Sequence, residues 1–517
     1  MFTWQCFISV KFYIERKGSA HLSLDRLLAD KETRPRYIVS SREVGLRRDL
    51  RSRHLSMIAI GGAIGTGVFV ASGSSISTAG PGGALLAYII VGIMVYFVMT
   101  SLGEMATFMP VAGSFEQYAT RFVDPALGFA LGWNYWYTWT VTLPAELAAG
   151  AMVMRYWFPH VPAIVWSAAF LALLFLLNVV SVKGYGEGEY WFAGIKVITI
   201  VAFILVGLAM IFGILGGHPV GWHVFMTGGT PFHGGWVGFL STVMVAGFAF
   251  QGTELVGLAA GESDHPERNV PRAIRTVFWR ILLFYVLAIF VIGMLIPYTD
   301  PNLLNASVNN VAISPFTLVF RRAGFAFAAG VMNAVILTAV LSAGNSSLYA
   351  SSRMLWALAC EGKAPKVFAK VNRHGVPMNA LYVNTAIGFV AFLSSIVGNG
   401  AIYTWMLNAA SLTGFLAWLG IAVSHYRFRK AYVAQGRSLD DLVYRAKWYP
   451  FGPLFAAALC AVVIIGQDTS VFTGGKIDWM GVVATYIGIP LFVVLWLGYK
   501  WIKKTKVIPL TEVQFEE

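Results

Sequence analysis

Long apolar stretches, separated by short polar segments, follow one another along the chain from about residue 55 to residue 501. A helix of roughly 20 apolar residues crosses about 30 Å of hydrocarbon, and twelve stretches come close to that length. They predict an all-α membrane protein with about twelve transmembrane helices. The expected spans are 55–78, 84–105, 127–154, 161–182, 189–215, 236–260, 276–297, 325–356, 379–397, 401–424, 450–467 and 480–501.

The charge of the chain agrees with a surface that faces lipid. Only 12% of the 517 residues are charged and 57% are hydrophobic, whereas about 25% of the residues of a soluble domain are charged. The net charge of +13 would suit a nucleic-acid partner, but the basic residues are not spread along the chain. With the N-terminus inside, 33 of the 38 Lys and Arg residues fall in inner segments and 4 in outer loops. This bias predicts that both termini are cytoplasmic and that the positive charge faces anionic lipid.

Two of the stretches are interrupted near their middle by glycines and polar residues. The first interruption runs from Gly61 to Gly67 with four glycines in seven residues, and the second places Gln251, Thr253 and Glu254 between glycines. Each glycine weakens a helix by about 1 kcal/mol, and unwound backbone is tolerated in a membrane only where protein or a wet cavity satisfies it. For the first stretch, close packing through small residues is the alternative. Interruptions in the first and sixth spans are typical of secondary transporters built from inverted repeats.

Four segments near these positions carry a family resemblance. They are 56–62, 128–137, 252–255 and 342–346. The sequence resembles the amino acid–polyamine–organocation superfamily, and closely the bacterial lysine-specific permeases of its amino-acid transporter family. The resemblance covers about nine-tenths of the chain, from about residue 45 onward, and its motifs are more specific for the superfamily than for the substrate.

The resemblance implies a LeuT-like 5+5 inverted-repeat fold, with spans 1 and 6 broken and two peripheral helices added. We therefore expect four regions. They are a cytoplasmic N-terminal tail at 1–53, a ten-helix transport core at 54–424, peripheral helices 11 and 12 at 425–502, and a cytoplasmic C-terminal tail at 503–517.

The resemblance also implies where an amino acid would bind. Its α-carboxylate would meet the backbone of Gly65, Thr66 and Gly67, and its α-ammonium would meet carbonyls near Phe248, with an aromatic ring there closing the site. The candidate substrate-binding residues are Ile64, Gly65, Thr66, Gly67, Glu146, Phe248, Ala249, Phe250, Thr253 and Glu254.

Two acidic residues, Glu146 and Glu254, lie well inside predicted spans. Glu146 follows Pro144, which removes a helix hydrogen bond and is expected to kink span 3. A carboxylate there suits a substrate with a second positive charge, and a protonated or internally bonded structural residue is the alternative. Glu254 would ligate substrate, carry a proton or cap amide groups freed by the break. The resemblance links the carboxylate at Glu254 to proton sensitivity.

Lys196 is the one basic residue well inside a predicted span. Burial makes an ammonium easier to deprotonate, which suits a proton carrier. The resemblance implies that this lysine occupies the place of a sodium ion beside the first break and hydroxyls of span 8, and so favours protons over sodium. The candidate proton-coupling residues are Lys196, Glu254, Ser342, Asn345 and Ser346. Snorkelling of Lys196 to the inner interface is the alternative.

Two further acidic residues are expected at the inner ends of spans. We interpret Glu104 as a gate or a structural residue, and Glu262 as a mainly structural residue at the cytoplasmic mouth that pairs with Arg268 or Arg272. The candidate gating residues are Glu104, Phe248 and Glu262.

The remaining patterns narrow the function. The sequence has no histidine or cysteine spacing typical of a metal site and no phosphate-binding loop, so we expect no metal, no cofactor and no enzyme. The predicted function is proton-coupled import of lysine across the cytoplasmic (inner) membrane, with lysine, protons and membrane lipids as partners and no nucleic acid. A permease of the same fold for arginine, histidine, aromatic amino acids or GABA remains an alternative. A transporter that also senses lysine with a membrane-bound regulator is another.

Overall fold

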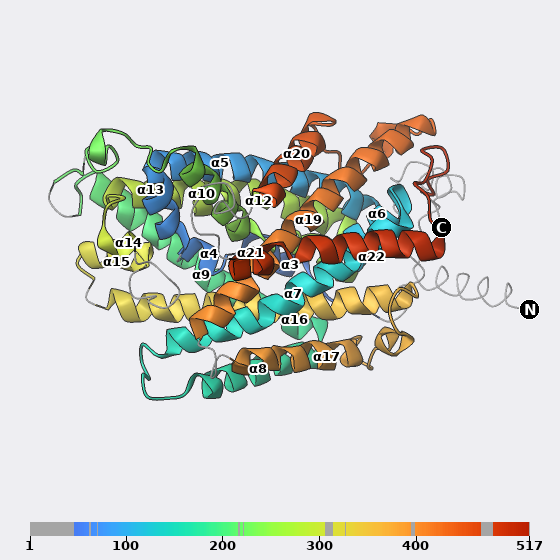
Figure 1. Cartoon of the computed structure of the whole chain (residues 1–517), viewed down its shortest axis with the longest axis horizontal. Helices are drawn as coiled ribbons and strands as arrows, with labels where there is room; N and C mark the ends of the chain where they lie inside the picture. Colours follow the sequence, from blue (N-terminus) through green and yellow to red (C-terminus); the bar gives the residue numbers. More distant parts are fainter. Residues whose placement is uncertain are drawn as a thin grey trace, which may run out of the picture. The chain divides into compact units, whose positions relative to one another are not determined.

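The regular structure of the described residues is helical (Figure 1). The computed structural model describes residues 46–61, 64–69, 71–215, 218–220, 222–304, 314–325, 327–393, 399–466 and 479–515. Among these residues the β contact is a single isolated bridge between Leu50 and Ser263. Seven helical segments are long and apolar enough to cross a membrane, and two shorter apolar segments, Met378–Leu393 and Phe451–Ile465, accompany them. The chain therefore has the composition and helix lengths of a multi-pass membrane protein.

The first predicted span is interrupted and then runs into the second. Helix α3 (Ser52–Gly61) is followed by non-helical Ile64 and Gly65 and by the short α4 (Thr66–Phe69). Helix α5 (Ala71–Phe108) joins spans 1 and 2 through a sharp bend at Gly80, which has φ 72° and ψ 166°. A side chain at Gly80 would approach the carbonyl oxygen of Pro231 to 2.6 Å. The bend thus requires glycine for both its positive φ and its close contact.

Span 3 forms the centre of the bundle. Helix α7 (Pro125–Met154) begins at Asp124, whose side chain accepts a hydrogen bond from the amide of Ala126 at 2.9 Å. It packs against α16 (Ala328–Cys360) and α19 (Asn399–Ala434). Just before it lies α6 (Phe115–Phe122), an amphipathic helix that the apolar pattern did not reveal.

Several helix ends differ from the predicted span ends. Helix α9 (Val182–Ile211) starts at Val182 rather than at 189, because Ser181 caps it by accepting a hydrogen bond from the amide of Gly184 at 2.9 Å. Helix α12 (Pro266–Arg280) starts ten residues before the predicted span at 276. Pro266 occupies its first turn, where no amide donor is needed. Helix α19 continues past 424 to Ala434.

The sixth predicted span is also interrupted. Helix α10 (Gly235–Phe250) ends at Phe250, and helix α11 (Leu255–Ala259) begins after four non-helical residues that include Gly252 at φ 91°. A 3₁₀ turn, Ala260–Glu262, follows α11. After α12 the chain passes through a π-helical turn, Ile281–Leu287, into α13 (Ala288–Leu295).

The other helices complete the bundle. They are α8 (Ala163–Val180), α14 (Pro301–Leu304), α15 (Pro315–Arg322), α17 (Met378–Gly388), α20 (Phe451–Ile465), α21 (Trp479–Tyr486) and α22 (Gly488–Lys503). Helices α8 and α17 pack side by side along one edge (Figure 1). Short 3₁₀ turns occur at Thr227–Gly229, Lys366–Ala369, Phe389–Leu393 and Leu439–Asp441.

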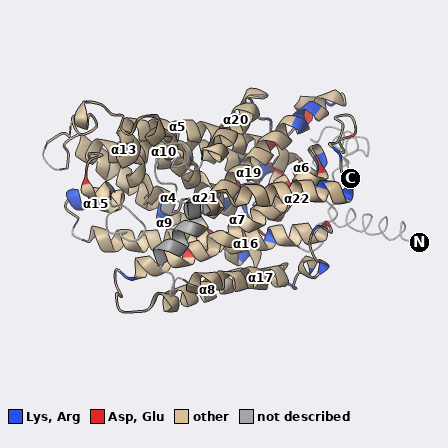
Figure 2. Ribbon diagram, viewed as in Figure 1, with Lys and Arg blue, Asp and Glu red and all other residues tan. Residues whose placement is uncertain are grey.

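Basic side chains gather at one end of the bundle. Figure 2 shows them near α6 and the C-terminal end of α22, with few along the helices. At the opposite end, α15 carries Arg321 and Arg322, and Arg322 pairs with Asp300 at 2.8 Å. The prediction that both termini are cytoplasmic depends on such an unequal distribution of basic residues between the two ends.

The C-terminal segment after α22 folds back onto α6 and α19. The amide of Ile508 donates to the carbonyl of Val123 at 2.9 Å, and the side chain of Gln435 donates to the carbonyl of Val513 at 2.8 Å. Phe515 is 2% exposed. It lies among four aromatic rings, those of Phe108, Phe122, Phe428 and Tyr432. The segment up to Phe515 is thus part of the packed structure.

Candidate functional site

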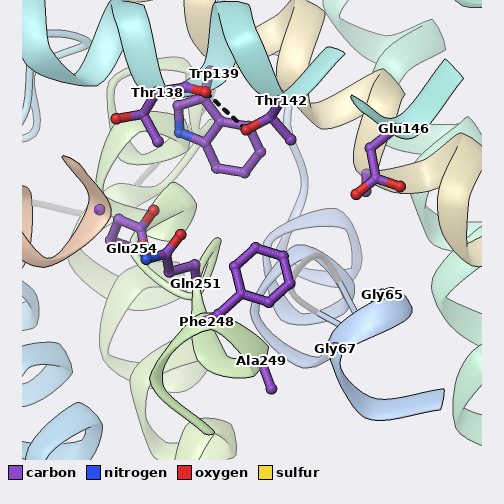
Figure 3. Close-up of a pocket in the computed structure, with 12 residues that line it drawn as sticks. Gly65, Gly67, Thr138, Trp139, Thr142, Glu146, Phe248, Ala249, Gln251 and Glu254 are labelled. Carbon is purple, nitrogen blue, oxygen red and sulfur yellow. Dashed lines mark hydrogen bonds between the residues drawn. The ribbon is translucent and has the colours of Figure 1, made fainter. Parts of the chain in front are cut away.

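A pocket lies between the two interruptions and helix α7 (Figure 3). It has a volume of about 570 Å³, including space open to solvent. Helix α7 forms one wall, the two breaks form the opposite wall, and α16 and α19 each add one small residue. The lining residues are Gly65, Gly67, Thr138, Trp139, Thr142, Glu146, Phe248, Ala249, Gln251, Glu254, Ala343 and Gly414.

The two breaks approach each other through backbone. A side chain at Gly67 would lie 2.7 Å from the Cα of Ala249, so α4 and α10 leave no room there for one. Gly65 has open space beside it, and its carbonyl accepts hydrogen bonds from the amides of Val68 and Phe69. Where α4 and α10 meet, main-chain groups therefore line the pocket.

The aromatic residues at the end of α10 face different ways. The ring of Phe248 extends into the cavity in Figure 3. Phe250 is fully buried and stacks on Tyr285 with ring centroids 4.0 Å apart. Of the two, Phe248 is the residue placed to contact a bound molecule.

The other predicted binding residues divide between the lining and the surrounding core. Gly65, Gly67, Glu146, Phe248, Ala249 and Glu254 are lining residues. Ile64 and Thr253 are buried behind the lining, where the Thr253 hydroxyl donates to the carbonyl of Phe250. The side chain of Thr66 falls outside the described part of the structure.

Glu254 accepts three hydrogen bonds beside the second break. The donors are the Tyr135 hydroxyl at 3.2 Å, the Trp418 indole nitrogen at 2.9 Å and the amide of Gly252 at 3.1 Å. One carboxylate oxygen thus satisfies a main-chain donor freed by the break, as the capping alternative requires. The other oxygen connects the break to α7.

Glu146 has a different environment. Its side chain is 5% exposed, and its Oε2 has no hydrogen-bond partner among the described residues. It lies on α7, two turns after Trp139, and lines the side of the pocket next to α16 (Figure 3). An unpaired buried carboxylate oxygen is costly, so this position can accept a donor from a ligand.

Lys196 is buried at the first break. Its Nζ donates to the carbonyl of Gly61 at 2.7 Å and to the hydroxyl of Ser342 at 2.8 Å, and the side chain is 0% exposed. The snorkelling alternative is therefore wrong. Ser342 in turn donates to Oε1 of Glu189 at 2.6 Å. The amine thus links three helices, α3, α9 and α16.

Comparison with known proteins decides the family. The family model described as "Amino acid permease" matches residues 54–510. The chain belongs to the amino acid permease family. Its members named below are permeases, so the protein is a membrane transporter and not an enzyme.

Three relatives are similar to this permease over almost their whole length. The lysine-specific permease LysP of Escherichia coli (strain K12) is 58% identical over 474 residues, which cover 92% of this chain and 97% of the relative. The lysine-specific permease LysP of Lactococcus lactis subsp. cremoris is 51% identical, covering 92% and 94%. The histidine permease HisP of the same organism is 51% identical, covering 90% and 98%.

The remaining predicted residues of the permease near the pocket lie on α16. Asn345 accepts a hydrogen bond from Asn178 at 2.8 Å, and the hydroxyl of Ser346 lies 3.4 Å from that of Tyr185. Both are buried close to Ser342. They belong to the polar layer between α8, α9 and α16 rather than to the pocket lining.

The predicted gating carboxylates form buried ion pairs away from the lining. Glu104 receives two hydrogen bonds from Arg429, at 2.6 and 2.5 Å, and one from the amide of Ala446 at 2.6 Å. These contacts connect α5 to α19 and to the segment after it. Phe248, the third predicted gate, is in the pocket itself.

Glu262 pairs with residues of α16. Arg353 donates to its Oε1 at 3.1 Å and Tyr349 donates at 2.8 Å. The prediction that Glu262 pairs with Arg268 or Arg272 is wrong, and Arg272 donates to Ser52 instead. The partner lies 91 residues further along the chain, beyond what local sequence spacing reveals.

Several residues of the site were not predicted. Thr138, Trp139 and Thr142 line the pocket from α7, at positions eight, seven and four before Glu146. This spacing is that of one helix face, so counting back from Glu146 would have found them. Glu189 precedes Lys196 by seven residues and shares its face. It was missed because the span was expected to start there.

Proposed function

We propose that this permease imports lysine into the cytoplasm across the inner membrane and that protons drive the import. Two of the relatives above are named lysine-specific permeases, which supports lysine as substrate. The observation that carries the proposal is the unpaired carboxylate oxygen of Glu146 in the pocket wall. A cationic side chain supplies the donor that this oxygen lacks.

In this proposal the zwitterionic part of lysine lies between the two breaks. The start of α4 at Gly65 to Gly67 would bind the α-carboxylate, because helix amide ends attract anions. Carbonyls at the end of α10 would bind the α-ammonium, and Phe248 would close over it. The ε-ammonium would extend along α7 to Glu146. A neutral side chain would leave that carboxylate buried and unpaired, so the pocket favours a cation.

The proposal includes a LeuT-like arrangement of twelve spans. Interruptions at α3–α4 and at α10–α11 support two inverted repeats of five helices, within a core at 54–424 and with peripheral helices at 425–502. The basic end of the bundle in Figure 2 supports a cytoplasmic location for both tails. Lys196 and Glu254 are the proposed proton-coupling groups.

Uptake into proteoliposomes tests the proposal. One charge moved across 100 mV is worth about 2.3 kcal/mol, so lysine alone would accumulate about 50-fold, and lysine with one proton about 2,000-fold. We expect accumulation above the first ratio when a pH gradient is added to the potential. A lysine accumulation ratio that does not change when a pH gradient is imposed at fixed potential would contradict proton coupling.

The role of Glu146 has its own test. Glu146→Gln should weaken lysine binding at least tenfold, because a neutral amide does not compensate the ε-ammonium. A matched control is Glu187→Gln, which removes a carboxylate that pairs with Arg53 near the start of α9. Equal lysine affinity in Glu146→Gln and the unaltered protein would exclude the pairing.

Histidine is a second candidate substrate. The 51% identity to a histidine permease favours it, and an imidazolium could also pair with Glu146. Competition of labelled lysine uptake by histidine, arginine and a neutral amino acid separates the candidates. Stronger competition by histidine than by unlabelled lysine would make histidine the substrate.

A further inference from the structure

Glu189 and Lys196 form a buried pair that the pocket does not include. They are seven residues apart on α9, two turns of one face, and both side chains are 0% exposed. The Lys196 Nζ and the Glu189 Oε1 are 4.0 Å apart. They are joined through Ser342, whose hydroxyl accepts from Lys196 at 2.8 Å and donates to Glu189 at 2.6 Å.

We infer that Glu189 receives the proton that Lys196 releases, through the hydroxyl of Ser342. This inference rests on the proposed proton coupling and names a further group in it. One N–H proton of Lys196 moves to Oγ of Ser342, and the hydroxyl proton of Ser342 moves to Oε1 of Glu189. An ammonium and a carboxylate become an amine and a carboxylic acid, the hydroxyl is restored, and no other reactant is needed.

The chemistry of a serine hydroxyl makes this step reversible. A hydroxyl has one donor and two acceptor positions, so Ser342 can bridge the pair in either protonation state with its hydrogen bonds reversed. The distances of 2.8 and 2.6 Å are those of ordinary or strong hydrogen bonds. The Lys196 Nζ and the Glu189 Oε1 are 4.0 Å apart, which is too far for a hydrogen bond between them, so direct transfer is not favoured.

The other charged groups near Lys196 are less suited than Glu189 to accept its proton. Arg280 on α12 and Glu146 on α7 also interact electrostatically with Lys196. Arg280 donates to the carbonyl of Ala59 at 2.5 Å, and a guanidinium does not release its proton in proteins. Glu146 lines the pocket and is proposed to bind substrate. Among the described residues, the neutral side chains of Tyr185, Asn345 and Ser346 also lie near Glu189.

The transfer would loosen the first break. A charge-assisted hydrogen bond is about twice as strong as a neutral one, so a neutral Lys196 holds the carbonyl of Gly61 more weakly than the ammonium does. The proton would meanwhile cross the 4.0 Å between the Lys196 Nζ and the Glu189 Oε1, toward the start of α9. Proton movement and release of the end of α3 are thereby coupled.

Three variants in proteoliposomes test the relay, with two readouts. Counterflow of labelled lysine reports binding and alternation without a gradient, and accumulation driven by a pH gradient reports coupling. Glu189→Gln and Ser342→Ala should each lower pH-driven accumulation about tenfold or more, flatten its pH profile, and keep counterflow within about twofold. Ser342→Thr, which retains a hydroxyl, should keep both readouts. Glu187→Gln should behave like the unaltered protein.

The outcomes separate the relay from other roles. If Ser342→Ala keeps pH-driven accumulation while Glu189→Gln loses it, Glu189 is only a counter-charge and the relay is overturned. If Ser342→Ala also loses counterflow, the result for Ser342→Thr separates the two explanations. Counterflow in Ser342→Thr without pH-driven accumulation overturns the relay, whereas counterflow together with pH-driven accumulation supports the relay. If the unaltered protein shows no response to the pH gradient, the proposed proton coupling fails first, and the relay fails with it.

Discussion

The two breaks are held by opposite charges. At the first, the end of α3, Lys196 donates to the carbonyl of Gly61 and Arg280 donates to the carbonyl of Ala59. At the second, before α11, the carboxylate of Glu254 accepts from the amide of Gly252. A helix end exposes carbonyls and attracts cations, and a helix start exposes amides and attracts anions. Each break thus carries the charge that its main chain requires.

The breaks also differ in where their partners come from. The cations at the first belong to α9 and α12, far along the chain, whereas Glu254 is part of the second break. Movement of α9 or α12 therefore changes the first break directly, and the second is held within its own segment and by α7 and α19. This difference predicts that substitutions at the first break affect transport more than those at the second.

The largest effect is expected for Lys196→Met. It leaves the carbonyl of Gly61 with the amide of Ile64 but without its charged donor, and it leaves Glu189 with an uncompensated buried charge. Removing one partner of a buried pair costs about 3–5 kcal/mol. Lysine uptake and counterflow should both fall below about 5% of the unaltered protein. Radiolabelled uptake and the melting temperature in detergent measure the two effects.

A double variant is the control for this charge effect. Lys196→Met combined with Glu189→Gln removes both charges, so it should recover part of the lost thermal stability without recovering uptake. A double variant less stable than Lys196→Met alone would show that the pair does not act through charge.

A smaller effect is expected for Glu254→Gln at the second break. The amide nitrogen of the new Gln would face one of the three groups that now donate a hydrogen bond to the carboxylate. Because that donor would lose its acceptor, the protein should lose about 1–3 kcal/mol of stability. Thermal unfolding measures this, and Glu267→Gln, in the first turn of α12, is the matched control. If Glu254→Gln abolished counterflow without any loss of stability, Glu254 would act on substrate rather than on the break.

Arg280→Lys sharpens the comparison at the first break. Arg280 contacts both the carbonyl of Ala59 and, at 2.9 Å, the hydroxyl of Tyr285, and an ammonium lacks the planar fork that reaches both. The uptake rate should fall about two- to fivefold with little change in lysine affinity. An unchanged rate would show that the second cation is dispensable.

The smallest effect is expected at a helix start outside the membrane. Burial opposes ionisation of Asp124, but hydrogen bonds from Lys500, the Ala126 amide and Thr505 hold the pKa of this carboxyl below its ordinary value of 3.8. Its contribution to stability is therefore fully present above about pH 4 and is lost as the pH falls through the lower folded value. Asp124→Asn should cost about 1 kcal/mol or less, with the difference constant between about pH 5 and 8 in thermal unfolding. A difference that varied within this range would contradict the assignment.

Apolar length and glycine placement predicted a helical membrane protein and the two interrupted segments. The spans are recognisable because lipid demands long apolar helices, and the breaks because glycine and polar residues are costly there. Helix starts were harder, since Ser181 and Pro266 begin helices within polar sequence. Helix α6 was missed because an eight-residue amphipathic helix lacks the length of a span.

The site was predictable only as far as local sequence reveals it. Glu146, Lys196 and Glu254 were found because a charge inside an apolar stretch is rare. The partner Trp418 was not found, since it lies 164 residues from Glu254. Ser342, 146 residues from Lys196, was expected beside that lysine only because of the family resemblance. Whether Phe248 or Phe250 faces the pocket depends on where α10 ends, which composition does not specify.

The burial of Phe515 has a practical consequence for work on this permease. A reporter or purification handle joined directly to Glu517 would begin three residues after Phe515, whose ring is 2% exposed. A rigid fusion there would pull the ring from its aromatic neighbours and loosen α6 from α19, so a flexible spacer is advisable. Conversely, a fluorophore attached to this end by a short tether would report when the parts of α6 and α19 near Phe515 move.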